Sequence, residues 1–331
     1  MASLVQLKNF AGHRFVALVE NDALRLLTGV ESAYALCQNA LATGQSLIAA
    51  ARTAASGELI PYDAAYQAHE WRMLPAFDHP AEPARCFVTG TGLTHRASVD
   101  NRNAMHQENS ALTDSMRMYQ WGVEGGAPQP GSIGVSPEWF YKGNGTCLRG
   151  HGEALTIPAF AEDGGDESEI AGIYLIDGQG QPRRVGMAQG NEFSDHVLEK
   201  KNYLYLASSK LRECSIGPEL ILDPDFDAVP GRARIHREGS VLWEKPIRSG
   251  QANMCHTLEN IEHHHFKFPM HRQPGDVHIH FYGASAFSFG DHVRLTSGDV
   301  MEVNFQGFGR PLRNPIAAEA GPATLSRVRG L

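Results

Sequence analysis

From residue 137 to its last residue, the chain is divided into short apolar runs by turn-forming pairs of residues. Glycine follows aspartate, proline or serine in these pairs, which are Asp177-Gly178, Pro230-Gly231, Pro274-Gly275 and Ser297-Gly298. Such residues favour tight turns and interrupt helices. Short strands at this spacing are typical of a β-sandwich, barrel or roll. The 34 glycines and 18 prolines of the whole chain agree with this and disfavour a helical bundle.

The first 80 residues have a different pattern, which predicts a small N-terminal α/β domain, 1–80, before a larger domain, 81–331. Residues 4–18 alternate loosely, as a hairpin does, and residues 34–55 have apolar side chains at the spacing of one amphipathic helix. Prolines within residues 71–83 indicate a linker. Beyond it, residues 85–90 predict a strand, and residues 99–120, which lack glycine and proline, predict a helix.

Charge and cysteine content argue against several classes of protein. The net charge is −8, whereas duplex nucleic acid is bound mostly by basic faces that neutralise phosphates. The five cysteines form no CxxC pair, which disfavours a zinc ribbon and a disulfide framework. No segment has the apolar length of a signal peptide or of a membrane span. We therefore expect a cytoplasmic protein that binds neither nucleic acid nor a membrane.

Two glutamates, Glu167 and Glu169, stand two positions apart at the start of an apolar run. On a strand, their side chains would lie on the same face. Two adjacent carboxylates are costly unless a cation lies between them, and Mg²⁺ prefers oxygen ligands. A solvated acidic strand edge is the alternative interpretation of such a pair.

Two further polar blocks follow this pair. Glu192 comes after a turn near Gly178 and Gly180, so a hairpin-like return could bring it beside Glu167 and Glu169. Lys210 lies among small polar residues ahead of a Gly-Pro turn. On spacing alone, Lys210 could equally be an ordinary surface lysine.

In this order, the blocks resemble the fumarylacetoacetate hydrolase family. Its members carry a Glu-x-Glu pair, a carboxylate in an Asn-Asp-x-Ser element, and a lysine before an Ile-Gly-Pro turn. The matching segments here are 167–169, 191–194 and 210–218. Segment 86–96 is similar to the opening strand of the family, 137–142 to its Pro-x-x-Phe-x-Lys element, and 273–315 to its glycine-rich final series. The resemblance covers residues 85–316.

The resemblance implies both a fold and a set of site residues. The implied fold class is α+β and β-rich, with a mixed β-sandwich or roll as the catalytic domain. Glu167, Glu169 and Glu192 are expected to ligate Mg²⁺, or alternatively Mn²⁺. Lys210 is expected to be catalytic, as a proton shuttle or an electrostatic stabiliser. Substrate contacts are expected from Thr94, Lys142, Phe193, Ser194 and Ser285.

Several positions depart from the pattern of the hydrolases in this family. Glu192 stands where aspartate is usual and reaches one methylene further. Ser285 stands in a segment that replaces a Thr-Gly-Thr-Pro element. Ser98 falls near the place of a catalytic histidine, and His106 and Glu108 are the candidate substitutes for the missing His-Glu pair. These departures disfavour hydrolysis of a carbon–carbon bond.

The predicted metal site suits a 2-oxo acid substrate. A divalent ion held by three carboxylates can chelate the carboxylate and keto oxygens and stabilise the enolate formed when a C3 proton leaves. A C4 hydroxyl can then depart as water. Segments 191–196 and 307–312 resemble the sugar-acid branch of the family. This implies a Mg²⁺-dependent 2-keto-3-deoxy-pentonate dehydratase that yields 2-oxoglutarate semialdehyde (2,5-dioxopentanoate) and forms a homodimer or higher oligomer.

Three alternatives stay open. The same metal site could serve an acylpyruvate or 2,4-diketo-3-deoxy sugar-acid hydrolase, or a degenerate site could bind sugar acids without turnover. His278 and His280, two positions apart, also resemble the histidine pair of a cupin metal site, although no glutamate closely follows them. Packing on a sheet face or at a subunit contact is the other interpretation of these histidines.

Overall fold

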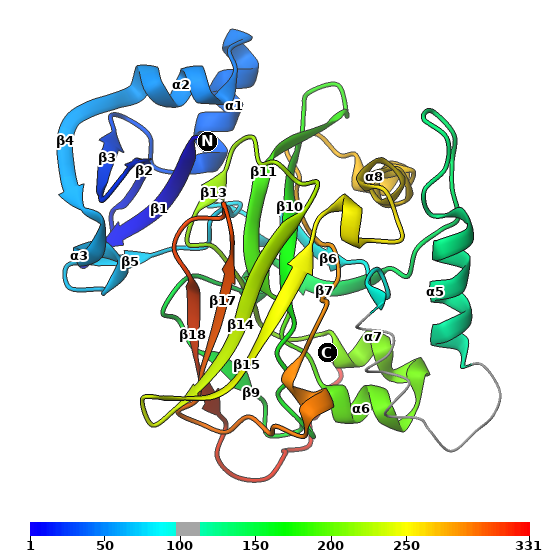
Figure 1. The fold of residues 1–331 in the computed structure, drawn as a ribbon. Helices are drawn as coiled ribbons and strands as arrows, with labels where there is room; N and C mark the ends of the chain where they lie inside the picture. The colour runs from blue at the N-terminus through cyan, green and yellow to red at the C-terminus, as the bar shows by residue number, and fades with distance from the viewer. Residues whose placement is uncertain (97–112) are drawn as a thin grey trace.

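The computed structural model describes residues 1–96 and 113–331, whose strands form two sheets. The larger sheet has the order β4-β3-β2-β1-β13-β11-β10-β16-β6-β7, with β5, β8 and β12 paired beside this path (Figure 1). Its strands are β1 (Ser3–Asn9), β2 (Arg14–Glu20), β3 (Ala23–Leu27), β4 (Ala55–Pro61), β5 (Trp71–Met73), β6 (Cys86–Gly90), β7 (Phe140–Asn144), β8 (Leu148–Arg149), β10 (Ser168–Ile176), β11 (Pro182–Asn191), β12 (Cys214–Ile216), β13 (Leu220–Ile221) and β16 (Val277–Phe281).

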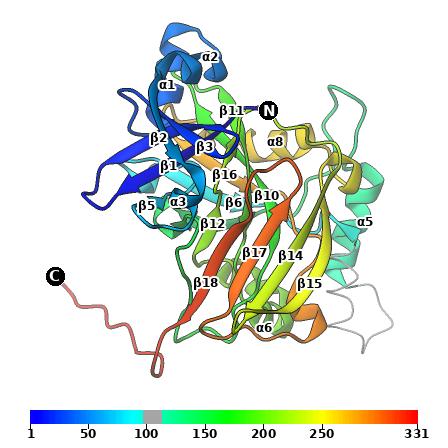
Figure 2. The same cartoon turned by 60° about the vertical axis from the view of Figure 1, so that its left-hand side comes forward.

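The smaller sheet has the order β15-β14-β17-β18-β9, and Figure 2 shows β15, β14, β17 and β18 side by side across the front of the molecule. Its strands are β9 (Leu155–Ile157), β14 (Val229–Arg237), β15 (Ser240–Ser249), β17 (Val300–Phe305) and β18 (Leu312–Ala318). The helices are α1 (Ala33–Thr43), α2 (Leu47–Ala54), α3 (Tyr62–Tyr66), α5 (Asp114–Gly125), α6 (His196–Lys201), α7 (Leu206–Ser209) and α8 (Leu258–Phe266). This α+β, β-rich architecture confirms the predicted fold class.

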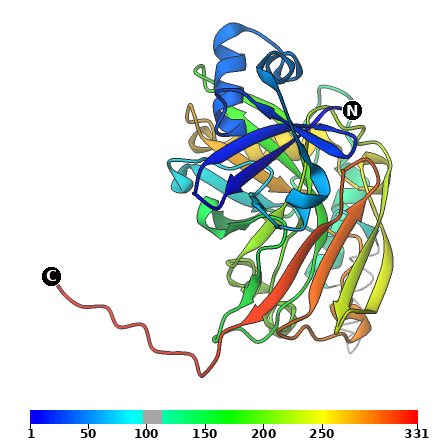
Figure 3. The ribbon, with the colours of Figure 1, turned by 90° about the vertical axis from the view of Figure 1, so that its left-hand side faces the viewer.

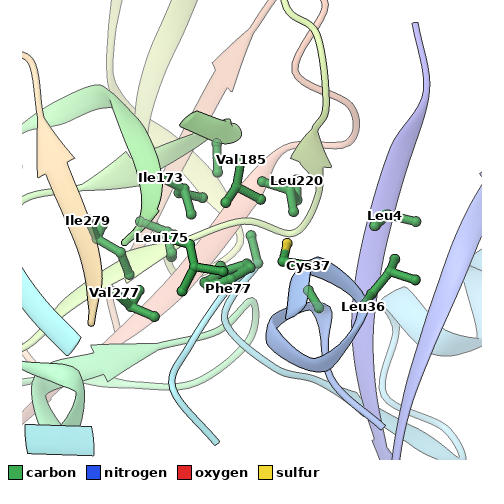
Figure 4. Packing of buried hydrophobic residues seen from close by; sticks show 14 of the residues in the cluster. Leu4, Leu36, Cys37, Phe77, Ile173, Leu175, Val185, Leu220, Val277 and Ile279 are labelled. Atoms are coloured by element: carbon green, nitrogen blue, oxygen red, sulfur yellow. The ribbon is translucent and has the colours of Figure 1, made fainter. Parts of the chain in front are cut away.

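Both faces of the central strand β10 are buried, because a different layer covers each face. Ile173 and Leu175 pack in one apolar cluster with Leu36 and Cys37 of α1, as Figure 4 shows. Ile170 packs instead against side chains of the smaller sheet. This alternation follows from the two-residue period of a strand. It explains why residues 170–176 form a continuous apolar run after the two glutamates.

The N-terminal segment joins the rest of the molecule through main-chain and side-chain contacts. β1 pairs with β13, so the hairpin predicted over residues 4–18 extends the larger sheet. The cluster that contains Leu36 also contains Leu4 and Ile279. In Figure 3 the N-terminal strands form one end of this sheet, and α1 and α2 lie beside them. The proposed division of the chain at residue 80 stays a prediction.

Three local predictions need correction. The helix predicted over residues 34–55 is two helices, because Gly44 ends α1 in the left-handed region (φ 66°) and the Ser46 side chain caps α2. Within the predicted linker, Trp71–Met73 is a strand that pairs with β1. The helix predicted over residues 99–120 falls partly on residues 97–112, which lie outside the described residues, and α5 covers Asp114–Gly125.

Within residues 1–96 and 113–331, no helix combines the length and apolar composition that crossing a bilayer requires.

Candidate metal and active site

The β10–β11 hairpin brings the three predicted carboxylates together. Its strands pair with Ser168 opposite Asn191 and Glu169 opposite Gly190. Immediately beyond the ladder, the Glu192 N–H donates to the Glu167 carbonyl over 2.9 Å. Glu167 and Glu192 therefore flank the open end of one hairpin, as the hairpin-like return in the sequence predicts.

The side chains of Glu167, Glu169 and Glu192 form one compact cluster. One carboxylate oxygen from each lies within 4.8 Å of the others. The residues are 4%, 1% and 0% exposed, respectively. Among the described residues, this is the one group of three or more His, Cys, Asp or Glu side chains whose ligand atoms lie close enough for a single ion.

Two buried lysines lie beside this cluster. Lys210 Nζ donates to Glu192 Oε2 over 2.6 Å and to Glu167 Oε1, and it lies 3.3 Å from Glu199 Oε1. Lys142 Nζ lies 2.7 Å from Glu192 Oε1 and also donates to the carbonyls of Phe193 and Lys210. Lys210 therefore bridges two of the three carboxylates, and Lys142 binds the second oxygen of one of these two, Glu192.

The segment after Glu192 adds a hydroxyl and an imidazole to the cluster. Ser194 Oγ donates to Glu167 Oε1 and lies 3.3 Å from Lys210 Nζ. His196 Nε2 lies 3.1 Å from the same Glu167 oxygen. His196 was not singled out by the sequence. The one clue to His196 in the sequence is that it lies in the same short polar block as Glu192 and Ser194.

Glu169 is held from the other side of the cluster by the segment after β16. The Gly283 N–H donates to Glu169 Oε2 over 2.7 Å. Thr94 packs against Gly283 so closely that a Cβ added there would lie 2.1 Å from Thr94 Oγ1. Gly283 also has φ +94°, a conformation that favours glycine. This glycine thus permits both the turn and the approach of Thr94.

The other predicted site residues lie in different surroundings. Ser285 Oγ accepts from the Arg248 N–H over 2.9 Å, and the Phe193 ring is fully buried in the apolar cluster between the sheets. Lys142 directs its contacts to protein oxygens, which favours a role in positioning Glu192. Contact of Ser285, Phe193, Lys142, Ser194 or Thr94 with a substrate stays a prediction. Ser98, His106 and Glu108 lie outside the described residues.

The chemistry of the donor set fits a hard divalent cation. Burial and the carboxylates of Glu192 and Glu167 raise the pKa of Glu169 well above its ordinary value. Three carboxylates, those of Glu167, Glu192 and Glu199, share the two lysine ammonium groups, and Glu169 adds a fourth carboxylate to the same cluster. An excess of buried negative charge is costly unless a cation compensates it. Oxygen-only ligands suit Mg²⁺ or Mn²⁺ better than softer metals.

The histidines of the proposed cupin-like site have another role. His278 and His280 both point into the interior from β16, and each is at most 1% exposed. His278 Nδ1 lies 3.0 Å from His265 Nε2, and the two ring nitrogens of His280 contact the Thr89 and Thr91 hydroxyls. These rings therefore pack on a sheet face, which was one of the two interpretations left open.

The buried histidines predict a loss of stability in acid. Burial lowers the pKa of His278 and of His280 to about 3, so both stay neutral in the folded protein while they become protonated below about pH 6.5 in the unfolded chain. Between pH 6.5 and 5, each should therefore lower the free energy of unfolding by up to about 1.4 kcal/mol per pH unit. Urea unfolding at several pH values measures this slope. His278→Phe should reduce the slope, and an unchanged slope would contradict the assignment.

Comparison with known proteins bears on the same site. No family model matches the chain. The chain is 26% identical over 179 residues to a protein of Haloferax volcanii described as a probable 2-keto-3-deoxyxylonate dehydratase. That match covers 52% of this chain and 58% of the relative.

Solved structures extend the comparison to nearly the whole chain. A 2-keto-3-deoxy-D-arabinonate dehydratase superimposes with a TM-score of 0.70 at 19% identity, over 96% of this chain and 100% of that one. The chain has the fold of this sugar-acid dehydratase. Another structure of such a dehydratase, complexed with magnesium and 2,5-dioxopentanoate, has a TM-score of 0.69 at 19% identity, with the same coverage.

The fold also extends to enzymes of other activity. A 2-hydroxyhepta-2,4-diene-1,7-dioate isomerase from Mycobacterium marinum has a TM-score of 0.59 at 15% identity, over 97% of this chain and 100% of that one. The fold that the resemblance implies is thus confirmed. Because enzymes with this fold catalyse more than one reaction, the residues of the site determine the activity.

Proposed function

We propose that this protein is a Mg²⁺-dependent hydro-lyase that converts a 2-keto-3-deoxy-pentonate into 2,5-dioxopentanoate. The observation that carries the proposal is the buried cluster of Glu167, Glu169 and Glu192, within a fold shared with a dehydratase whose structure holds magnesium and this product. The relative described as a probable 2-keto-3-deoxyxylonate dehydratase supports the same substrate class. Thus the site and the relatives favour the same reaction.

The three glutamates would hold the metal through one oxygen each, and Mn²⁺ would fit the same ligands. When bound, the divalent ion supplies Lewis-acid stabilisation for the negative charge that develops on the 2-oxo group. The Gly283 N–H fixes the orientation of Glu169, and Lys142 fixes that of Glu192. The protein thereby preorganises its ligands before substrate arrives.

Lys210 is proposed to act electrostatically in this reaction. Its ammonium already donates to Glu167 and Glu192 and lies near Ser194. An ammonium group held at this place stabilises negative charge that develops nearby in the transition state. The stabilisation is stronger in a buried site, because water screens it less. A role of Lys210 as a proton shuttle is the alternative, and catalytic roles of His106 and Glu108 stay proposals that rest on the resemblance alone.

Product analysis tests the proposal against its alternatives. EDTA-treated protein, with and without added Mg²⁺, is incubated with 2-keto-3-deoxy-xylonate, with 2-keto-3-deoxy-arabinonate and, separately, with a 2,4-diketo acid. The products are identified by mass spectrometry. We expect 2,5-dioxopentanoate in the presence of Mg²⁺ only. Formation of pyruvate from a 2,4-diketo acid, without any 2,5-dioxopentanoate from the pentonates, would establish the hydrolase instead. Mg²⁺-dependent ligand binding without turnover would establish a sugar-acid-binding protein.

We also propose that the protein acts in the cytoplasm as a homodimer or higher oligomer. The proposal rests on the resemblance to the fumarylacetoacetate hydrolase family. Sedimentation equilibrium at micromolar concentration tests the oligomeric state directly. A mass equal to the 36.2 kDa of one chain would contradict it.

A further inference from the structure

A buried histidine next to the site has one ring nitrogen with no protein partner. His95 is 2% exposed, and Thr94 Oγ1 lies 2.8 Å from its Nδ1. Its Nε2 has no hydrogen-bond partner among the described residues. A buried polar atom left without a partner is costly and calls for an explanation. A ligand that reaches this nitrogen would provide one.

The neighbouring threonine determines which nitrogen of His95 carries the proton. Thr94 Oγ1 lies 2.7 Å from the carbonyl oxygen of Tyr282, which can only accept a hydrogen bond. The single hydroxyl proton of Thr94 is therefore donated to Tyr282, and Thr94 must accept from His95. The proton of the neutral ring is thus on Nδ1, and Nε2 presents a lone pair.

The ring stays neutral in the folded protein. Burial lowers the pKa of His95 to about 4. At neutral pH, Nε2 is accordingly an acceptor and has no proton to donate. The natural partner of such an atom is the hydroxyl group of a ligand.

The loop that carries His95 is fastened to the segment that orients a metal-binding glutamate. The Thr91 N–H donates to the Phe281 carbonyl over 2.9 Å, and Thr94 donates to the Tyr282 carbonyl. The next residue, Gly283, donates to Glu169. His95 is thus connected to Glu169 through Thr94, Tyr282 and Gly283.

We infer that His95 is a specificity-determining residue whose Nε2 accepts a hydrogen bond from a hydroxyl at the end of the substrate chain remote from its 2-oxo acid group. The inference rests on the proposed function. For a 2-keto-3-deoxy-pentonate, this hydroxyl is the one on C5. The C4 hydroxyl leaves as water and needs a proton, which Nε2 does not carry.

A pair of substrates that differ by one hydroxyl tests the inference. The compound 4-hydroxy-2-oxopentanoate keeps the C4 hydroxyl that departs but lacks the C5 hydroxyl. For the wild-type protein, kcat/KM should favour 2-keto-3-deoxy-pentonate by roughly 10- to 100-fold, since one hydrogen bond to a buried acceptor distinguishes the two. In His95→Leu this preference should fall to within about threefold. A preference that stays at the wild-type ratio would overturn the inference.

Further variants separate the role of His95 from a general loss of structure. Thr94→Val removes the oxygen that fixes the His95 proton and should reduce the preference for the substrate with the C5 hydroxyl. Thr94→Ser keeps this oxygen and should keep the preference. His79 is a matched control, because its Nε2 is also buried and unpartnered among the described residues, but its Nδ1 accepts from the Glu82 N–H and its ring packs against Tyr34 of α1, neither of which belongs to the carboxylate cluster. His79→Leu should keep the wild-type ratio.

The outcomes also distinguish the inference from the proposed function. Wild-type protein that dehydrates neither compound would overturn the proposed function, and the inference with it. Wild-type protein that dehydrates both, with a ratio that neither His95→Leu nor Thr94→Val changes, would overturn the inference alone. If His95→Leu does not fold, as judged by circular dichroism, the comparison of Thr94→Val with Thr94→Ser decides.

Discussion

Glu169→Gln should lower the rate of 2,5-dioxopentanoate formation by at least about a thousandfold, because it removes one of three charged metal ligands while keeping the shape of the side chain. The Gly283 N–H can still donate to the amide oxygen. Relief of the repulsion with Glu167 and Glu192 should leave the fold at least as stable without metal. The measurements are kcat/KM at saturating Mg²⁺ and the melting temperature in EDTA.

A surface glutamate provides the matched control. Glu162 forms an ion pair with Lys201 at the surface, so Glu162→Gln should retain wild-type activity. Glu169→Gln with more than a tenth of the wild-type kcat/KM would show that Glu169 is not a ligand that the reaction requires.

Lys210→Met should destabilise the metal-free protein by about 3–5 kcal/mol, because it leaves buried carboxylates without their shared cation. Lys210 is fully buried and contacts both Glu167 and Glu192. Added Mg²⁺ should stabilise this variant more than the wild type, since the ion then supplies the missing positive charge. Urea unfolding with EDTA and with Mg²⁺ measures both effects.

The exposed Lys201 again offers the comparison. Its ion pair with Glu162 is largely solvated, and such pairs contribute at most about 1 kcal/mol. Lys201→Met should therefore change stability little and show the wild-type response to Mg²⁺. A Lys210→Met protein as stable as Lys201→Met in EDTA would contradict the structural role assigned to Lys210.

The cluster of Glu167, Glu169 and Glu192 was predictable because its geometry follows from local rules. Glu167 and Glu169 stand at the start of an apolar strand, and a hairpin with a glycine turn returns Glu192 to the same end. The two-residue period of strands and the pairing of a hairpin are sufficient to bring these carboxylates together. The resemblance added the order of the blocks and the place of Lys210.

Other parts of the site depend on contacts between distant segments. The N–H of Gly283 meets Glu169 across 114 positions of sequence, and no local pattern predicts such a contact. His95 and His196 become informative only when their partners are known. Similarly, the break at Gly44 within an alanine-rich stretch depends on a left-handed turn, which a search for helical periodicity overlooks.

The central claim, that Glu167, Glu169 and Glu192 form the metal site of this protein, is tested most directly by titrating Mn²⁺ into EDTA-treated, desalted protein. Electron paramagnetic resonance measures the free ion during the titration. We predict one Mn²⁺ bound per chain in the wild type, displaced by excess Mg²⁺, and binding at least about 100-fold weaker in Glu169→Gln. Equal affinity in the two proteins, or no binding by the wild type, would contradict the claim.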